Sequence, residues 1–250
     1  MSVEGKGIVV TGGANGLGLA AVEMLTARGA RVAIIDVNPK SLDPVVERLT
    51  SGGADVFGLI GDIVPKTEAY GLFGKAVDRL GRVDGVINCA GVYPRKPILE
   101  ITDEDWTLDW TVNVRGTYNI MAAAVELMRG QDIVTTVRGR IVNITSVDAF
   151  KAHPKNAHYA ATKAAVVSLT RSFADEFAPD QILINSVAPA GIATEKAKGA
   201  GFLDELASHT PLRRNAQPDD IAEWIVFMLS DANRYMTGEN VIVSGGYIYA

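Results

Sequence analysis

Short apolar runs alternate with longer helical patterns along the whole chain of 250 residues. Runs such as "VAII" and "ILINSVA" are apolar on both faces, which is typical of strands covered by helices on both sides of a parallel sheet. Strands that alternate with helices predict right-handed βαβ units. The sequence therefore predicts an α/β fold. We expect a single doubly wound Rossmann-type domain over residues 1–250, with a parallel sheet of about seven strands and helices on both faces.

The periodicity places each element. The expected strands are Gly7–Val10, Arg31–Ile35, Asp55–Ile60, Val83–Ile87, Gly139–Ile144, Ile182–Val187 and Asn240–Val243. The expected helices are Gly16–Arg28, Ser41–Thr50, Thr67–Leu80, Asp103–Met128, Tyr159–Phe177 and Asp219–Leu229. The segment Thr194–Gln217 has no clear periodicity, so we expect a mobile substrate loop above the sheet there.

Composition excludes several other classes of protein. The formal net charge of −5 argues against nucleic acid and anionic membrane surfaces as partners. The longest apolar runs are strand-sized and far below the roughly 20 residues that a membrane span needs. The single cysteine, Cys89, excludes an intrachain disulfide framework, and the histidines lack partners for a metal site. We expect a cytoplasmic protein that binds no metal ion and acts on a small molecule.

A glycine-rich turn, "TGGANGLG", follows the first expected strand and opens the first expected helix. Gly12, Gly16 and Gly18 fit a tight turn, a close approach of backbone to a pyrophosphate, and close packing of helix on strand. Free backbone N–H groups and the positive end of the helix would face the phosphates. The turn therefore predicts a dinucleotide site, because it has the strand and helix that such a site requires.

Asp36 ends the second expected strand, at the position where a carboxylate receives the ribose hydroxyls of an adenosine. This carboxylate would repel a 2′-phosphate. Val37 and Asn38, which follow Asp36, are not basic, and neither is Asn15 in the glycine turn. The sequence therefore favours NAD over NADP, although Asp36 could also serve only as a turn or capping residue.

Further polar residues follow other strands, where open α/β sheets bind their ligands. Asp62 follows the third strand, "NCAG" at 88–91 the fourth and Ser146 the fifth. In "HYAATK", Tyr159 and Lys163 are four residues apart, so a helix presents both on one face. Singly these are ordinary turn, cap or surface residues, but together they outline one crevice.

These motifs resemble those of the short-chain dehydrogenase/reductase family over essentially the whole chain. The family's T-G-x-x-x-G-x-G motif is Thr11–Gly18. Its Asn-Asn-Ala-Gly motif is present at 88–91, with Cys89 in place of the second asparagine. Its Asn-x-Val-x-Pro-Gly motif is also present, with Ala190 in place of the glycine. The family's catalytic Asn, Ser, Tyr and Lys fall on Asn113, Ser146, Tyr159 and Lys163. The expected cofactor contacts are Gly12, Asn15, Gly16, Leu17, Gly18, Asp36, Asp62, Ile63, Asn88, Ala90, Gly91, Tyr159, Lys163, Pro189, Ile192 and Thr194.

The resemblance implies a role for each catalytic residue. Tyr159 would exchange a proton with the alcohol, Ser146 would bind the substrate oxygen, and Asn113 would hold a water in a proton relay. Lys163 would bind the nicotinamide ribose, and its ammonium is expected to lower the pKa of Tyr159, which is about 10 in a free tyrosine. Thr194 would bind the nicotinamide carboxamide. The family also implies a homotetramer, or a homodimer, built on the two long central helices.

The substrate itself is less constrained. Candidate contacts are Asp148, His153, Tyr93, Arg95 and Ala190, with Lys96 and the segment Glu195–Phe202. Asp148 could accept hydrogen bonds from further hydroxyl groups, or it could be a solvated strand-end residue. Arg95 and Lys96 could meet a carboxylate, or belong to the surface.

The sequence as a whole predicts an oxidoreductase that transfers a hydride between NAD(H) and a secondary alcohol or ketone of the polyol, sugar or cyclic-alcohol type. One alternative is a 3-oxoacyl thioester reductase, against which Asp36 argues, since such enzymes resemble NADPH users. Another is a catalytically silent NAD-binding protein, against which the presence of Tyr159 and Lys163 argues.

Overall fold

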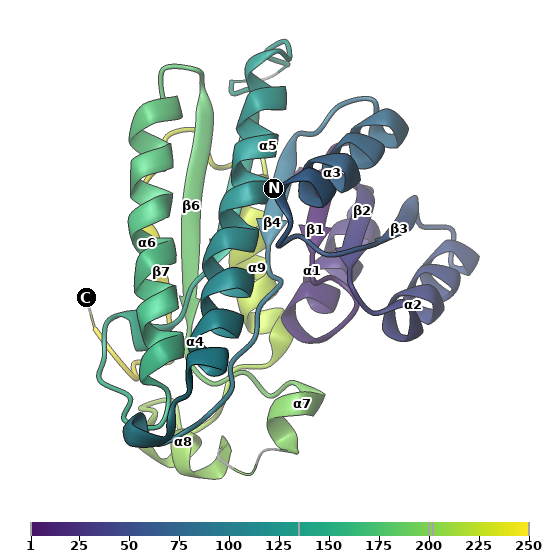
Figure 1. Cartoon of the computed structure of the whole chain (residues 1–250). Helices are drawn as coiled ribbons and strands as arrows, with labels where there is room; N and C mark the ends of the chain where they lie inside the picture. Colours follow the sequence, from purple (N-terminus) through teal and green to yellow (C-terminus); the bar gives the residue numbers. More distant parts are fainter. Residues whose placement is uncertain (1, 135, 200, 202, 250) are drawn as a thin grey trace.

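The computed structural model describes residues 2–134, 136–199, 201 and 203–249. Seven parallel strands form one sheet in the order β3-β2-β1-β4-β5-β6-β7 (Figure 1). Their bounds are β1 Gly7–Thr11, β2 Arg31–Asp36, β3 Val56–Ile60, β4 Gly85–Asn88, β5 Gly139–Ile144, β6 Ile182–Pro189 and β7 Asn240–Val243. The chain builds outward from β1 to β3 and then crosses back to β4. The order therefore reverses between β1 and β4, where open α/β sheets form their binding crevice.

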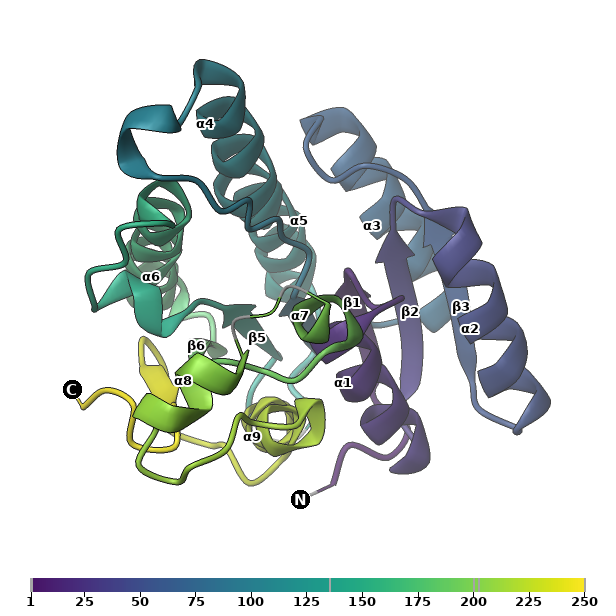
Figure 2. The same cartoon turned by 90° about the horizontal axis from the view of Figure 1, so that it is seen from below.

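Helices cover both faces of this sheet. The longer ones are α1 Gly16–Ala27, α2 Pro39–Ser51, α3 Lys66–Leu80, α5 Thr117–Arg129, α6 Ala157–Phe177 and α9 Pro218–Leu229. Figure 2 shows α1 and α9 on one side of the strands and α3, α5 and α6 on the other. The expected doubly wound α/β domain is confirmed, and every expected strand and helix except the helix at 103–128 is present as one element to within a few residues.

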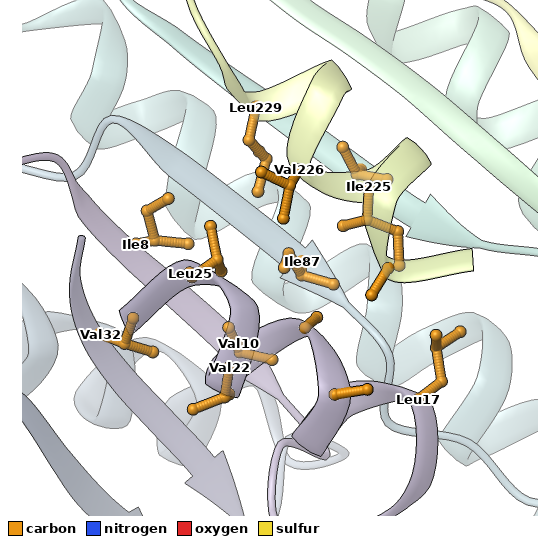
Figure 3. Packing of buried hydrophobic residues seen from close by; sticks show 14 of the residues in the cluster. Ile8, Val10, Leu17, Val22, Leu25, Val32, Ile87, Ile225, Val226 and Leu229 are labelled. Carbon is orange, nitrogen blue, oxygen red and sulfur yellow. The ribbon is translucent and has the colours of Figure 1, made fainter. Parts of the chain in front are cut away.

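Alternating strand residues divide the core into two layers. Ile8 and Val10 of β1 pack with α1 and α9, whereas Val9 between them packs with α3 and α5 on the other face. Figure 3 shows the first layer, in which Leu25 of α1 and Leu229 of α9 lie over the strands. These side chains are fully buried. Since each large aliphatic side chain contributes about 1.5–3 kcal/mol when buried, the two layers hold the sheet in place.

The long helix expected over Asp103–Met128 is divided into three segments. It consists of α4 Asp103–Asp109, a π-helical segment Trp110–Gly116, and α5. Such π-helical turns are rare and frequently occur at functional sites. Periodicity could not locate this one, because one wider turn shifts the apolar pattern only slightly.

The prediction of an irregular loop over Thr194–Gln217 is wrong for two stretches of that segment. The structure has two short helices there, α7 Glu195–Lys198 and α8 Leu203–His209. Helices of four and seven residues complete too few turns for an apolar repeat to be visible. Both lie at one end of the sheet (Figures 1 and 2). Phe202, included among the expected pocket residues, lies outside the described residues.

The described part of the chain contains no helix that is both long and apolar enough to cross a bilayer. Its longest helix, α6, has 21 residues but carries charged side chains along its length, and its two ends lie within the same domain.

Two glycine contacts in the β1–α1 turn join the elements at the point where the strand order reverses. A Cβ on Gly18 would lie 2.2 Å from the carbonyl oxygen of Gly12. A Cβ on Gly12, whose φ is +67°, would lie 2.7 Å from the Cα of Ala90. The expected packing role of Gly18 is confirmed. Gly12 brings β1 against the loop after β4, so these glycines set the floor of the crevice.

We predict opposite effects for alanine at two helical glycines. Gly18→Ala should destabilise the fold by about 1–3 kcal/mol, because the added methyl overlaps a backbone oxygen that cannot move without displacing α1. Gly74→Ala in α3, where a Cβ meets nothing within 4 Å, should stabilise the fold by about 0.5–1 kcal/mol. Urea unfolding of both variants and the natural protein measures this. Equal effects would contradict the close approach of α1 to β1.

Candidate active site

A cleft of about 1540 Å³ opens between the carboxyl ends of the strands and the helices α7 and α8. It runs from the glycine turn and Asp36 at one end to Ser146 and Tyr159 at the other. The elements that form it come from all parts of the chain, and the parallel sheet brings their ends together. The cleft therefore has the length and position expected for a dinucleotide with a substrate beyond it.

Nearly all the residues predicted from the sequence line this cleft. They are Gly12, Asn15, Gly16, Leu17, Gly18, Asp36, Asp62, Ile63, Ala90, Gly91, Tyr93, Arg95, Ser146, Asp148, His153, Tyr159, Pro189, Ala190, Ile192 and Thr194. Four others do not line it: Asn88, Asn113 and Lys163 are buried in the wall behind it, and Lys96 instead pairs with Asp105 at 2.6 Å. Asn88 donates its amide to Asn143 Oδ1 at 2.8 Å, so its side chain joins β4 to β5 inside the protein.

Asp36 defines the charge at one end of the cleft. Its Oδ2 accepts a hydrogen bond from the backbone N–H of Ala14 at 3.2 Å, and its Oδ1 accepts one from that of Asn38 at 3.0 Å. Both bonds hold the carboxylate at the mouth of the glycine turn. The neighbouring lining residues Val37 and Asp62 are not basic. This end of the cleft would repel an additional phosphate.

The glycine turn forms a cradle that leaves no room for side chains. Gly16 has a φ of +53°, and a Cβ there would lie 3.3 Å from the methyl group of Thr194. The Thr194 hydroxyl in turn caps α7 by accepting from the backbone N–H of Ala197 at 3.3 Å. A bare backbone with a helix N-terminus behind it suits a pyrophosphate. These residues fit a nicotinamide dinucleotide.

Thr11 supports this cradle in a way that the glycine pattern alone does not reveal. Its hydroxyl accepts from the backbone N–H groups of Cys89 and Ala90, at 3.2 and 3.3 Å. The same hydroxyl donates to the carbonyl of Ile87 at 3.4 Å. Thr11 therefore fixes the loop after β4 to the end of β1. The sequence signal for it was its place in the turn motif, which assigned no contact.

Tyr159 lies against Ser146 at the other end of the cleft. Burial is the largest influence on the phenol and raises its pKa, and the nearby Asp148 carboxylate raises it further. The neighbouring Ser146 hydroxyl works in the opposite direction and lowers the pKa. The net direction is upward, so the expected depression of the Tyr159 pKa by Lys163 is not found in this structure.

Lys163 is buried, and the position of its ammonium group explains why the pKa of Tyr159 is not lowered. Its Nζ donates to the carbonyl oxygen of Ile144 at 2.7 Å and lies 5.5 Å from the centroid of the Tyr159 ring. Burial lowers the pKa of Lys163 from 10.5 to about 8. A buried ammonium with one carbonyl partner is costly to keep charged, so this residue loses its proton within an accessible pH range.

Asn113 lies in the π-helical segment with both polar atoms in use. Its Oδ1 accepts from the backbone N–H of Val92 at 2.9 Å, and its Nδ2 donates to the Val92 carbonyl at 2.9 Å. The Nδ2 group also donates to Thr162 Oγ1 at 3.2 Å, and Thr162 donates to the carbonyl of Tyr159 at 2.7 Å. The side chain thus ties the loop after β4 to α6, and Thr162 is a link that sequence reasoning missed.

The predicted substrate residues surround Tyr159. The Asp148 carboxylate accepts from Asn156 Nδ2 at 3.1 Å, and the Tyr93 ring packs edge-on against Tyr159 with 6.3 Å between centroids. Arg95 contacts His153 at 3.3 Å. Lys196 of α7 lies over the Tyr93 ring, 4.3 Å from its centroid. Partly exposed charged and aromatic side chains therefore lie around the Tyr159 end of the cleft.

Comparison with known proteins identifies the architecture. Residues 12–248 match the family model described as "Enoyl-(Acyl carrier protein) reductase". An uncharacterized oxidoreductase of Methylorubrum extorquens is 36% identical over 98% of this chain and 98% of its own length. The 3-oxoacyl-(acyl-carrier-protein) reductase of Thermotoga maritima is 31% identical over 99% of this chain and 100% of its own. A solved structure from Brucella melitensis, described as a short-chain dehydrogenase/reductase of the glucose/ribitol dehydrogenase type, has a TM-score of 0.90 and 31% identity, with 100% of both chains covered.

We predict that Lys163 makes stability rise with pH above about pH 8. Between its folded pKa of about 8 and its unfolded value of 10.5, the unfolded chain binds more protons than the folded one. The free energy of unfolding therefore increases through this window, by up to about 2–3 kcal/mol. Urea unfolding from pH 7.5 to 10 measures it, with Lys163→Met as the reference that lacks the titrating group. Parallel curves for the two proteins would show that Lys163 keeps an ordinary pKa.

Proposed function

The chain belongs to the short-chain dehydrogenase/reductase family of oxidoreductases, and on this basis we propose that it transfers a hydride between NAD(H) and a secondary alcohol or ketone. The contact of Ser146 with Tyr159, at the far end of the cleft from Asp36, is the observation that supports this most directly. A serine and a tyrosine hydroxyl side by side can bind the substrate oxygen and exchange its proton while the hydride moves.

Each residue then has a role in the oxidation of an alcohol. Ser146 donates a hydrogen bond to the substrate oxygen and holds it beside Tyr159. Tyr159 takes the proton of the substrate hydroxyl as general base, and in the reverse direction it returns that proton to the new hydroxyl. Bound NAD⁺ supplies the hydride acceptor and a positive charge that favours the phenolate.

Lys163 and Asn113 act behind these two groups. Lys163, when protonated, offers its remaining N–H donors to the ribose hydroxyls of the cofactor and adds a second positive charge near Tyr159. Asn113 holds the loop after β4 and the first turn of α6 in register. A water bound near it would pass the proton to solvent, as the family resemblance implies. Thr194, which caps the start of α7, would bind the nicotinamide carboxamide, as the family resemblance implies.

We infer NAD rather than NADP as the cofactor. The Asp36 carboxylate is held by two backbone N–H groups at the adenosine end, where Asn15 and Val37 provide no positive charge. A 2′-phosphate there would meet a negative charge without compensation, whereas ribose hydroxyls can donate to the carboxylate.

We further infer a substrate with several hydroxyl groups, such as a polyol or sugar. Asp148 lies close enough to Tyr159 to influence its phenol, and it lines the cleft. A carboxylate in this position can accept hydrogen bonds from a hydroxyl next to the reacting carbon. The glucose/ribitol-dehydrogenase description of the Brucella melitensis structure supports the same class.

A second candidate is the reduction of a 3-oxoacyl thioester. The Thermotoga maritima relative, which carries that name and aligns over its full length, favours it. Ser146 and Tyr159 would act in the same way on a ketone. Asp36 and Asp148 argue against it, because they place negative charge where a 2′-phosphate and an apolar acyl chain would lie.

For the assembly we propose a homotetramer, or a homodimer, built on α4–α5 and α6. Large apolar side chains are exposed along this region: Trp106, Leu108, Trp110 and Tyr118 are each between 41% and 48% accessible. Burying such a surface against a second copy would remove apolar area from water.

We predict NAD-dependent turnover that requires Tyr159. Initial rates of NADH and NADPH formation with a panel of secondary alcohols, sugars and polyols should favour NAD. Tyr159→Phe should lower kcat by about 10²–10⁴-fold, because the proton acceptor is lost. The Kd for NAD should change little, since the phenol hydroxyl adds few contacts to the dinucleotide. Preference for NADPH would contradict the role of Asp36, and rapid reduction of 3-oxoacyl thioesters with no alcohol oxidation would favour the second candidate.

We predict that Asp148→Asn discriminates between substrates. The variant should lower kcat/KM for polyols by about 10–100-fold, because a hydrogen bond to a charged group is lost. A simple secondary alcohol without a neighbouring hydroxyl should lose far less. The ratio of the two kcat/KM values in the variant and the natural enzyme measures the effect. An unchanged ratio would mean that Asp148 does not contact the substrate.

A further inference from the structure

Asp109 and His158 form a buried pair directly behind Tyr159. Asp109 is the last residue of α4, and His158 is the second residue of α6. Both side chains are 0% exposed, with Asp109 Oδ2 lying 3.5 Å from His158 Nε2. Within the described residues, neither carboxylate oxygen and neither ring nitrogen has a hydrogen-bond partner. A carboxylate and an imidazole thus face each other in an apolar helix interface without completing a bond.

Burying an unbonded carboxylate and imidazole destabilises the fold unless the two groups share a proton. Buried polar groups in folded proteins are nearly always hydrogen-bonded, and exceptions call for a functional explanation. A single proton between the two groups would cancel the charge and supply the missing bond, from the carboxyl to the imidazole or from the imidazolium to the carboxylate. A modest shortening of the 3.5 Å separation then gives an ordinary hydrogen bond.

The pair lies in the same helix interface that positions the catalytic tyrosine. His158 directly precedes Tyr159, and Asp109 lies four residues before Asn113. Asn113 crosses to α6 through Thr162, which is bonded to the backbone of Tyr159. The Trp106 ring packs edge-on against His158, with centroids 6.3 Å apart, and covers the pair from the α4 side. The start of α6 is therefore held through Thr162, and the nearby pair is a second contact to α6 that can change its protonation.

The charged groups that face the pair determine how it titrates. Burial raises the pKa of Asp109 to about 6; Asp105 of the same helix adds to this rise, and Lys163 of α6 opposes it. Burial lowers the pKa of His158, while Asp105 raises it and Lys96 lowers it. The charge on Asp109 in turn raises the pKa of both Tyr159 and Lys163. The pair and the catalytic groups therefore influence one another.

We propose that Asp109 and His158 are positioning residues that share one proton, and that this proton fixes the first turn of α6 and controls the negative charge behind Tyr159. With the proton in place the pair is neutral and bonded. Without it, Asp109 carries an uncompensated buried charge that disfavours the phenolate, and only the single N–H of a neutral imidazole is left to bond the carboxylate. The inference rests on the proposed role of Tyr159 in proton transfer.

The kinetic test separates charge from packing. Asp109→Asn retains the shape and can still bond a neutral imidazole, but it carries no charge. It should remove the step near pH 6 from the kcat/KM profile and move the limb that reports Tyr159 to lower pH, by roughly half a unit or more. Asp109→Leu also loses the bond, so kcat should fall on the order of 10-fold, with KM for NAD changed less than about twofold.

Two further proteins complete this test. Asp103→Asn removes an exposed carboxylate from the same helix and should leave the pH profile unchanged. The exchanged double variant Asp109→His with His158→Asp keeps one carboxylate, one imidazole and one proton. The double variant should have a higher kcat than the single variants Asp109→His and His158→Asp. If the exchange gives no recovery, or if Asp103→Asn shifts the profile as much as Asp109→Asn does, the proposal is wrong.

A second measurement needs neither substrate nor cofactor. The chain has three histidines, and His158→Gln assigns the ring signals of His158 in the NMR spectrum. In the natural protein these signals should move with the titration of Asp109 near pH 6, and in Asp109→Asn that movement should vanish. An unchanged His158 titration in Asp109→Asn would overturn the shared proton. If the enzyme proves inactive on every substrate tested, the proposed function fails, while this titration still decides the pair.

Discussion

The contact between two pieces of backbone in the β1–α1 turn is the constraint on which the rest of the molecule depends. Gly18 at the start of α1 packs against the carbonyl of Gly12, and Gly12 packs against Ala90 beyond β4. These approaches leave no space for a Cβ, and Thr11 secures them with three hydrogen bonds. The strand order reverses at this point, so the same contacts that close the fold also form the floor of the cleft.

Burial and charge are balanced against each other throughout the proposed site. Lys163, Tyr159 and Asp109 each have a pKa displaced toward the neutral form, and in each case burial is the largest cause. The Ser146 hydroxyl and the Ile144 carbonyl compensate only in part. Perturbed groups of this kind gather where proton transfer takes place. In the proposed mechanism, the positive charge of bound NAD⁺ would offset this bias toward the neutral forms, and the Asp109–His158 pair would hold a further proton behind the cleft wall.

Sequence reasoning located the lining of the cleft well because its residues sit at strand ends. Asp36, Asp62, Ala90 and Ser146 each follow a strand, and parallel strands bring their carboxyl ends to one edge whatever the details of packing. The reasoning failed where contacts depend on how helices cross. The carbonyl partner of Lys163 is 19 positions away in the chain, and the Asn113–Thr162 and Asp109–His158 contacts each join residues 49 positions apart. No local pattern marks any of them.

What the sequence by itself determined was the layer arrangement and the direction of every strand. Runs that are apolar on both faces, separated by helices, admit few arrangements other than a doubly wound parallel sheet, and the glycine turn sets its first crossover. The tertiary structure alone decided the electrostatics. The ammonium of Lys163 and the phenol of Tyr159 share a helix face as their spacing requires, but burial reverses the expected shift of the phenol pKa. Burial depends on what the other elements place around a side chain. The spacing of residues along one helix does not indicate which elements these are.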